Sequence, residues 1–318
     1  MQLNEFPEIE ISNMNSKDNS SITQLQEIDA VWDMETGDPD DFLTLLLLLG
    51  HPLVNLKAVT VTPGTPDQIG LVRHALSWFS LNIPVGAFNI EHDKVCVSKW
   101  HYKAYGQISA SRDAEPGDQV LLQYCDDTTT LITGGPLKNL GAALELAKVT
   151  GREFKLGRLV AQGGFAGEGV IPSDKQLDKF KGEQTCPTYN LNGDRKSALA
   201  VLEYSGIQIR RFVSKNVCHH VYYDQELHEY IRAIKDKSQS LALIWKGMDI
   251  YLRKKPMGKK LHDPLAACCA IDESIGTWAE VELYQERNEW GARLSPGSRT
   301  WIITDYDHSK FVRTLTAY

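Results

Sequence analysis

The chain has 318 residues, of which 42% are hydrophobic and 24% charged, and it carries a formal net charge of -7. These values exclude an intrinsically disordered or fibrous protein, and the negative charge argues against a nucleic-acid-binding surface or attraction to an acidic membrane. The length suffices for a large core, in one α/β domain or in two ordinary ones.

Residues 1–27 are polar and lack the basic start and apolar stretch of a secretory signal, so we expect a flexible N-terminal tail. The longest apolar run is too short to span a membrane. The six cysteines show neither C-x-x-C pairs nor regular spacing, which favours free thiols over a zinc site or a disulfide framework. These features together predict a cytoplasmic protein.

Strand-like and helix-like segments alternate from residue 27 onward. The apolar segment 27–33 is typical of a buried strand, and residues 40–52 have the pattern of a helix with acids in its first turn. The alternation continues with strand 55–64, helix 67–82, helix and strand within 119–135, helix 136–148, strand 157–164, helix 194–206 and strand 207–215. It predicts a doubly wound, mostly parallel sheet flanked by helices, in one domain spanning residues 28–318.

Three predicted strands end in polar or glycine turns, at residues 33–37, 133–135 and 162–164. Ligands of open α/β sheets bind outside the carboxyl ends of the strands, so we expect a site at these turns. Acids crowded at one strand end repel one another unless a cation neutralises them, and calcium or magnesium is the usual partner. The first turn, VWDMETGDPDDF, holds five carboxylates: Asp33, Glu35, Asp38, Asp40 and Asp41.

Three roles besides metal binding could account for the acidic turn. Acids favour helix N-termini, which accounts for those at the helix start but not for Asp33 and Glu35 on the strand side. A phosphatase-like aspartyl nucleophile requires D-x-D, where this chain has Glu35 as the second acid. A helix-loop-helix calcium loop requires a regular spacing that is absent. A second acidic feature, His262-Asp263, precedes a helical run far along the chain.

Taken in chain order, these motifs resemble the inosine-uridine-preferring nucleoside hydrolase family. The acidic turn at 33–41 resembles the family's D-x-D-P-G-x-D-D with one extra residue after the glycine, and 58–68 resembles its second strand. Residues 133–139 resemble T-G-P-L-T-N, 162–164 resemble M-G-G, 188–198 resemble E-F-N-x-x-x-D-P-E-A-A, and 262–266 match H-D-P-x-A. The resemblance covers nearly the whole chain from about residue 28.

This resemblance implies one calcium ion per subunit, bound by Glu35, Asp41, the backbone carbonyl of Thr133 and Asp263. It also implies hydrolysis of the N-glycosidic bond of a ribonucleoside or a related ribosylated small molecule, releasing free base and ribose. A metal can orient the sugar diol and lower the pKa of bound water, and a cluster of anions favours an oxocarbenium-like transition state. A homodimer or homotetramer is implied as well.

Individual roles follow from the same resemblance. Glu35 corresponds to the general base, and His262 assists the departing base as an acid or a hydrogen-bond donor. The expected substrate-binding residues are Asp40, Asn190, Thr65, Gln162, Thr188 and His101. Candidates to stack on the base are Trp100, Tyr102, Tyr105 and Tyr189.

Three positions depart from the family pattern. Glu35 stands in place of an Asp, Thr65 in place of an Asn, and Thr188 in place of the Glu that receives the 5'-hydroxyl. Without that carboxylate, a 5'-phosphate could enter, paired with Lys175, Lys179 or Lys181. Two alternative functions remain: a non-catalytic ribosyl-ligand-binding member of the same fold, or a phosphate-ester hydrolase that uses the same acidic turn.

Overall fold

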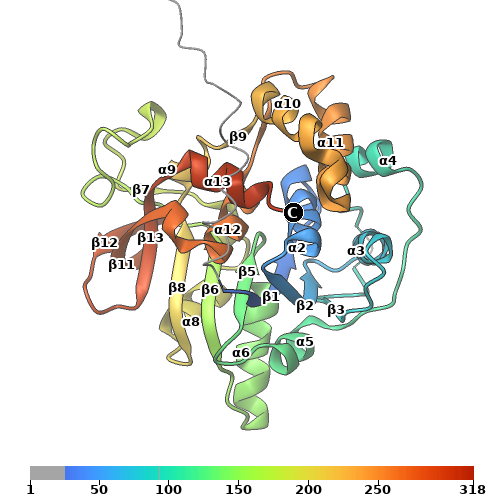
Figure 1. The fold of residues 1–318 in the computed structure, drawn as a ribbon. Coiled ribbons are helices and arrows are strands. Elements are labelled where there is room, and N and C mark those ends of the chain that lie inside the picture. Colours follow the sequence, from blue (N-terminus) through green and yellow to red (C-terminus); the bar gives the residue numbers. More distant parts are fainter. Residues whose placement is uncertain (1–25, 93) are drawn as a thin grey trace, which may run out of the picture.

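The computed structural model describes residues 26–92 and 94–318, so the expected tail at 1–27 lies almost entirely outside the described residues. Within them, an 11-stranded sheet runs through the molecule (Figure 1). Across the sheet the order is β4 (Glu115–Pro116), β3 (Val85–Ala87), β2 (Val54–Val61), β1 (Ile28–Met34), β5 (Thr130–Thr133), β6 (Leu156–Gln162), β8 (Ile207–Val213), β13 (Thr300–Tyr306), β11 (Gly276–Glu286), β12 (Glu289–Leu294) and β7 (Thr185–Cys186).

Helices cover this sheet, and a separate two-stranded ribbon joins β9 (Tyr222–Tyr223) to β10 (Lys259–Lys260). The helices are α2 (Pro39–Gly50), α3 (Pro66–Trp78), α4 (Lys99–Tyr105), α5 (Gly117–Tyr124), α6 (Lys138–Thr150), α7 (Tyr189–Gly193), α8 (Arg195–Glu203), α9 (Lys215–Cys218), α10 (Gln225–Ile234), α11 (Gln239–Leu252), α12 (His262–Ile271) and α13 (His308–Leu315). Short 3₁₀ turns lie at Asp178–Phe180, Lys235–Lys237 and Glu273–Ile275.

The sheet is parallel from β4 across to β13 and antiparallel at β11, β12 and β7. The central strands are buried on both faces, as expected for parallel strands covered by helices. This architecture confirms the predicted single-domain, doubly wound and mostly parallel fold.

The direction of winding reverses at β1. From β1 the chain moves outward to β2, β3 and β4 on one side, whereas β5, β6 and β8 follow on the other side. Parallel crossovers are right-handed, so the reversal puts α2 and α6 on opposite faces. A crevice opens outside the carboxyl ends of strands at such a reversal, and here these are β1 and β5.

The helix α2 explains how acids come to lie beside the core. Pro39 occupies the first turn of α2. The leucines of this helix are buried against the sheet and against α11 and α12. Figure 1 shows α2 and α12 side by side over the middle strands of the sheet. Burial of the apolar face carries the first turn inward, so Asp40 and Asp41 are only 2% and 4% exposed.

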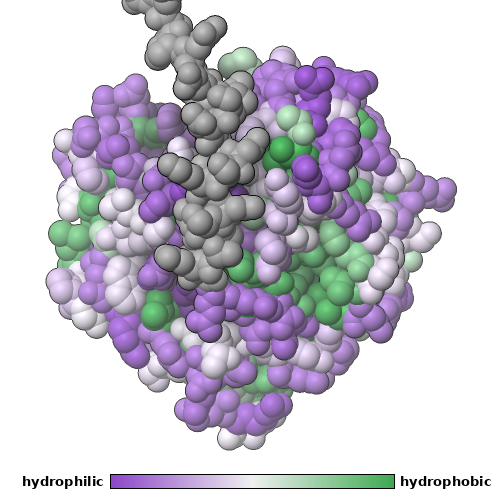
Figure 2. Space-filling view, viewed as in Figure 1, coloured by the Kyte–Doolittle hydropathy of each residue, from purple (hydrophilic) through white to green (hydrophobic). Residues whose placement is uncertain are grey.

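The outer surface is mostly hydrophilic on the face shown in Figure 2, with one hydrophobic area near the position of α2 and α3 in Figure 1. Within residues 26–92 and 94–318, every helix is too short or too polar to cross a bilayer.

Candidate active site

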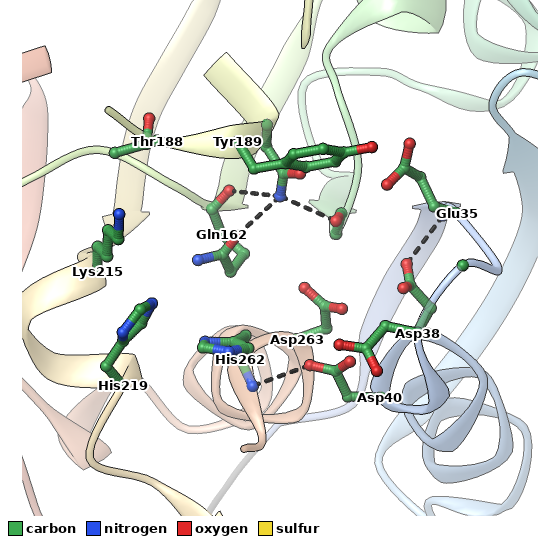
Figure 3. Close-up of a pocket in the computed structure, with 14 residues that line it drawn as sticks. Glu35, Asp38, Asp40, Gln162, Thr188, Tyr189, Lys215, His219, His262 and Asp263 are labelled. Atoms are coloured by element: carbon green, nitrogen blue, oxygen red, sulfur yellow. Dashed lines mark hydrogen bonds between the residues drawn. The ribbon is translucent and has the colours of Figure 1, made fainter. Parts of the chain in front are cut away.

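A cavity of about 570 Å³ lies where the sheet winding reverses. The carboxyl ends of β1, β5 and β6 meet there with the first turns of α2, α7, α9 and α12 (Figure 3). Most of the predicted site residues line it: Glu35, Asp40, Asp41, Gln162, Thr188, Asn190, His262 and Asp263. Side chains separated by more than 200 positions in the sequence therefore share one pocket.

Three buried carboxylates form what we call the acidic group: Asp40, Asp41 and Asp263. One oxygen from each lies within 4.8 Å of the others. Burial, and then repulsion from neighbouring carboxylates, raises the pKa of Asp41 and Asp263 well above its ordinary value. A hard divalent cation would relieve this repulsion, and an all-oxygen donor set suits calcium or magnesium better than zinc. The residues present therefore fit a metal site.

Glu35 lies in the same pocket but outside the acidic group. Its backbone N–H donates to Oδ1 of Asp41 at 2.8 Å, which closes the acidic turn. Burial raises the pKa of the Glu35 side chain to about 7, and Asp33 adds to the rise while Lys138 opposes it. A carboxyl group that is half ionised near neutral pH is suited to accept a proton from water.

The third acid of the group, Asp40, is held by two partners. Its Oδ2 accepts the backbone N–H of His262 at 3.1 Å, and its Oδ1 lies 2.9 Å from Nζ of Lys259. The same ammonium lies 3.1 Å from Asp38 and donates to the carbonyl of Lys260 at 2.7 Å. Burial opposes the charge on Lys259, yet Asp40 and Asp38 raise its pKa above the ordinary value. Asp40 is therefore the acid of the group least available to a metal.

The end of β5 approaches the acidic group closely. A Cβ on Gly134 would lie 2.8 Å from Cγ of Asp263, so only glycine fits there, and the peptide that follows Thr133 runs beside that carboxylate. Behind it, Asp33 is fully buried and accepts hydrogen bonds from Thr60 at 2.7 Å and Asn139 at 2.8 Å. Asp33 thus joins neighbouring elements rather than lining the cavity.

A second wall of the pocket is polar and uncharged. The side-chain amide of Asn190 donates to the carbonyl of Gly134 at 2.9 Å and to Oε1 of Gln162 at 2.7 Å. Thr188 is buried with no hydrogen-bond partner for its hydroxyl among the residues that the structure describes. Of the predicted stacking candidates, Tyr189 lines the cavity and is 73% exposed. These residues form a wall that could face a sugar and its substituents.

His262 lies between the acidic group and the far end of the pocket (Figure 3). Its Nδ1 is 3.1 Å from Sγ of Cys218, and its ring centroid is 4.9 Å from that of His219. Burial, and then Lys259 and Lys260, lowers the pKa of His262 to about 3. The imidazole is therefore neutral near pH 7.

Three predicted site residues are not part of the cavity lining: Thr133, the buried last residue of β5 directly before the lining residue Gly134, and Thr65 and His101. Thr65 begins α3, where its hydroxyl accepts the backbone N–H of Gln68 as part of a capping box. His101 is fully buried on α4, with its ring edge-on to Phe42 at 5.3 Å, and burial lowers its pKa to about 4. The side chain of Thr65 therefore caps a helix, and the side chain of His101 packs in the core.

Lys215, His219 and Lys259 belong to the site without having been predicted from the sequence. Lys215 and His219 follow β8, so the rule applied to three strand ends would have found them if applied to a fourth. Lys259 gave no such signal, because the β9–β10 ribbon brings it to Asp40 from a distant part of the chain.

Comparison with known proteins identifies the family and the fold. The family described as inosine-uridine preferring nucleoside hydrolase matches residues 30–313. The chain belongs to this family. As a nucleoside hydrolase family member it is divergent, since it is 28% identical over 288 residues to an uncharacterized protein of Aquifex aeolicus, covering 87% of this chain and 94% of that protein.

Other relatives of this nucleoside hydrolase family member have named activities. The pyrimidine-specific ribonucleoside hydrolase RihA of a Shewanella species is 26% identical over 276 residues, covering 78% of this chain and 80% of that one. The structure of an inosine-uridine preferring nucleoside hydrolase from Bacillus anthracis superposes with a TM-score of 0.66 at 21% identity, over 91% of this chain and 98% of that one. The structure of an inosine-guanosine nucleoside hydrolase superposes with a TM-score of 0.67 at 17% identity, over 90% of this chain and 97% of that one. These structures share the fold described above.

Proposed function

We propose that this chain is a calcium-dependent N-ribohydrolase. It hydrolyses the N-glycosidic bond of a ribonucleoside, or of a related ribosylated small molecule, and releases the free base and the ribose part. The observation that carries the proposal is the convergence of three buried carboxylates, Asp40, Asp41 and Asp263, on the floor of one cavity. Membership of the nucleoside hydrolase family supports the same reaction.

Asp41 and Asp263 would hold the calcium ion, with the Thr133 carbonyl and the Glu35 carboxylate as further oxygen donors. Asp40 is assigned to a ribose hydroxyl instead, because Lys259 already balances its charge, while each of its oxygens keeps a lone pair that can accept a hydroxyl. When bound, the ion supplies a positive charge that orients the sugar diol and lowers the pKa of water.

The chain's own groups supply the proton transfers. Glu35 accepts a proton from the attacking water, since burial keeps its pKa close to neutral. His262 is neutral at pH 7, so we assign it as a hydrogen-bond donor to the departing base rather than as a stored proton. Asn190 and Gln162, which are hydrogen-bonded to each other, shape the wall that contacts the sugar. Thr65 and His101 have no role in this proposal.

The test is release of base and of reducing sugar from nucleosides in the presence of calcium. Glu35→Gln keeps the shape of the side chain but removes the base, so kcat should fall by about 10²–10⁴-fold. The matched control is Glu145→Gln on the exposed surface of α6, which should retain full activity.

Two outcomes would favour the rival functions. Release of inorganic phosphate from phosphate esters, without release of base from nucleosides, would replace the proposal with a phosphatase. Ribose binding without any turnover in the wild-type protein would indicate a non-catalytic ligand-binding member of the family.

We further propose a cytoplasmic homodimer or homotetramer. All six cysteines are free thiols, which suits a reducing compartment. Light scattering on the purified protein would measure the assembly, and a monomeric mass at micromolar concentration would contradict it.

A further inference from the structure

The cavity carries opposite charges at its two ends (Figure 3). The acidic group, Glu35 and Asp38 lie at one end, and Lys215 and His219 line the other. Lys179 and Lys260 stand behind His219, close enough to lower its pKa. We call Lys179, Lys215, His219 and Lys260 the basic end. A ligand that spans the cavity must therefore satisfy both signs of charge.

The basic end is built onto the uncharged wall of the pocket. Nζ of Lys215 donates to the carbonyl of Pro187, directly before Thr188, at 2.8 Å and to Sγ of Cys186 at 3.3 Å, and keeps a third N–H donor. Nζ of Lys179 lies 2.6 Å from Nδ1 of His219. Thr188 and Asn190, which lie on this wall, are uncharged. An anion could approach these donors without meeting an acid.

The positive charges of the basic end are not neutralised by the protein. Within the described residues, none of its three lysines forms an ion pair with a carboxylate. By contrast, two lysines suggested by the sequence are already paired, since Lys175 lies 2.8 Å from Asp305 and Lys181 lies 2.6 Å from Asp178. Burial chiefly lowers the pKa of His219 to about 3, and His262 and the three lysines add to the effect.

The same region holds a possible soft-metal donor set, because Cys218, His219 and His262 offer atoms within 4.8 Å of one another. An anion suits the region better. The surrounding lysines repel a cation, and Nδ1 of His219 already contacts Lys179. Burial also raises the pKa of Cys218 to about 12, so the thiolate that a metal requires is disfavoured.

The geometry points to a ribosyl substrate that carries a 5'-phosphate, such as a nucleoside 5'-monophosphate. The sugar diol faces the acidic group, and the phosphate lies against Lys215 and His219, with the charges of Lys179 and Lys260 next to His219. This inference rests on the proposed N-ribohydrolase function. Water adds its hydroxyl to C1' and its proton to the base, so the products are free base and ribose 5-phosphate, and the phosphate ester stays intact.

Lysine ammonium groups bind phosphate as point charges, and a dianion responds more strongly to three of them than a monovalent carboxylate does. The 5' assignment follows from Thr188. Thr188 directly follows Pro187, whose carbonyl accepts a hydrogen bond from Lys215. By the family resemblance, Thr188 also replaces the acid that contacts the 5'-hydroxyl. A carboxylate on the base is the other source of negative charge, and the experiment separates the two.

The experiment measures base release from inosine, uridine, their 5'-monophosphates and a nucleoside whose base carries a carboxylate, all with calcium. We expect kcat/KM to be at least tenfold higher for the monophosphates than for the parent nucleosides. Lys215→Met should reduce this ratio at least tenfold, and Lys215→Arg should retain most of it. The matched control Lys175→Met removes a lysine that Asp305 neutralises, and its ratio should equal that of the wild type.

Calorimetry with ribose 5-phosphate, ribose and inorganic phosphate gives an independent reading, in which ribose 5-phosphate should bind at least tenfold more tightly than ribose. Equal or better turnover of the unmodified nucleosides would overturn this inference and leave the proposed function intact. Preference for the carboxylated base would overturn the 5' assignment. If no substrate releases base, the proposed function fails, and equal binding of ribose and ribose 5-phosphate would then overturn the anion site as well.

Discussion

Replacing Lys259 with methionine should have opposite effects on the stability of the metal-free protein and on its affinity for calcium. All three N–H donors of the Lys259 ammonium face oxygen atoms, at 2.9 Å from Asp40, 3.1 Å from Asp38 and 2.7 Å from the carbonyl of Lys260. Methionine has a similar length and keeps the buried space filled, so the substitution chiefly removes the charge.

The magnitude follows from these distances. At an effective dielectric constant of about 20, unit charges roughly 3 Å apart attract by about 5 kcal/mol, which applies to the buried Asp40. The attraction to Asp38 is weaker, because that side chain is 59% exposed and solvent screens it. Loss of hydration at a lysine that is only 5% exposed offsets part of this attraction. Removing one partner of a buried ion pair costs about 3–5 kcal/mol, and we expect that loss in the free energy of unfolding without calcium. Calcium should bind the variant at least tenfold more tightly, about 1.4 kcal/mol, because its pocket is more negative.

Denaturant unfolding in EDTA and in calcium, together with calorimetric titration of calcium, measures both quantities. The difference in stability between Lys259→Met and the wild type should narrow when calcium is added. Lys255→Met, an exposed lysine of the preceding loop, is the control and should change stability by no more than about 0.5 kcal/mol. A variant that loses equal stability in both conditions and binds calcium no more tightly would refute the reasoning.

Three further predictions concern the metal, a glycine and a histidine. Calcium at a hundred times its Kd should stabilise the wild type by about 2.7 kcal/mol, whereas Asp263→Asn should show no shift in a melting experiment. Gly134→Ala should cost about 1–3 kcal/mol in urea unfolding and weaken calcium binding, because its Cβ would lie 2.6 Å from Trp32. Burial lowers the pKa of His101 from 6.5 to about 4, so the unfolded chain binds the extra proton between these values. His101 should therefore contribute a loss of about 3 kcal/mol in stability as pH drops from 6.5 to 4, and His101→Phe should remove that share of the slope.

The central part of the fold was predictable because its signals are local. Strands β1, β2, β5 and β6 are short, largely apolar runs, and α2 carries its own start and stop in Pro39 and Pro52. The acidic turn and His262-Asp263 could likewise be assigned to one site through their resemblance to family motifs. The structure brings Asp41 and Asp263 together as that assignment requires.

The remainder depended on contacts that no local pattern reports. The sequence did not show that Asp40, rather than Glu35, groups with Asp41 and Asp263. Lys259, which holds Asp40, belongs to the β9–β10 ribbon and comes from a distant part of the chain. His101 lies among aromatic residues, and the sequence could not tell a core packing position from a mobile active-site position. The sequence also could not show which loop lysines are paired with an acid, because their partners, such as Asp305 for Lys175, are distant along the chain.

The opposite walls of the cavity come from different parts of the chain, the acidic one from β1, α2 and α12 and the basic one from segments after β8 and around Pro187. Evolution can therefore alter either wall without rebuilding the other. A relative in which Thr188 or Lys215 is exchanged could accept a different substrate while it keeps the same acidic group and the same hydrolytic reaction. Relatives with different substrates should therefore differ at these two positions first.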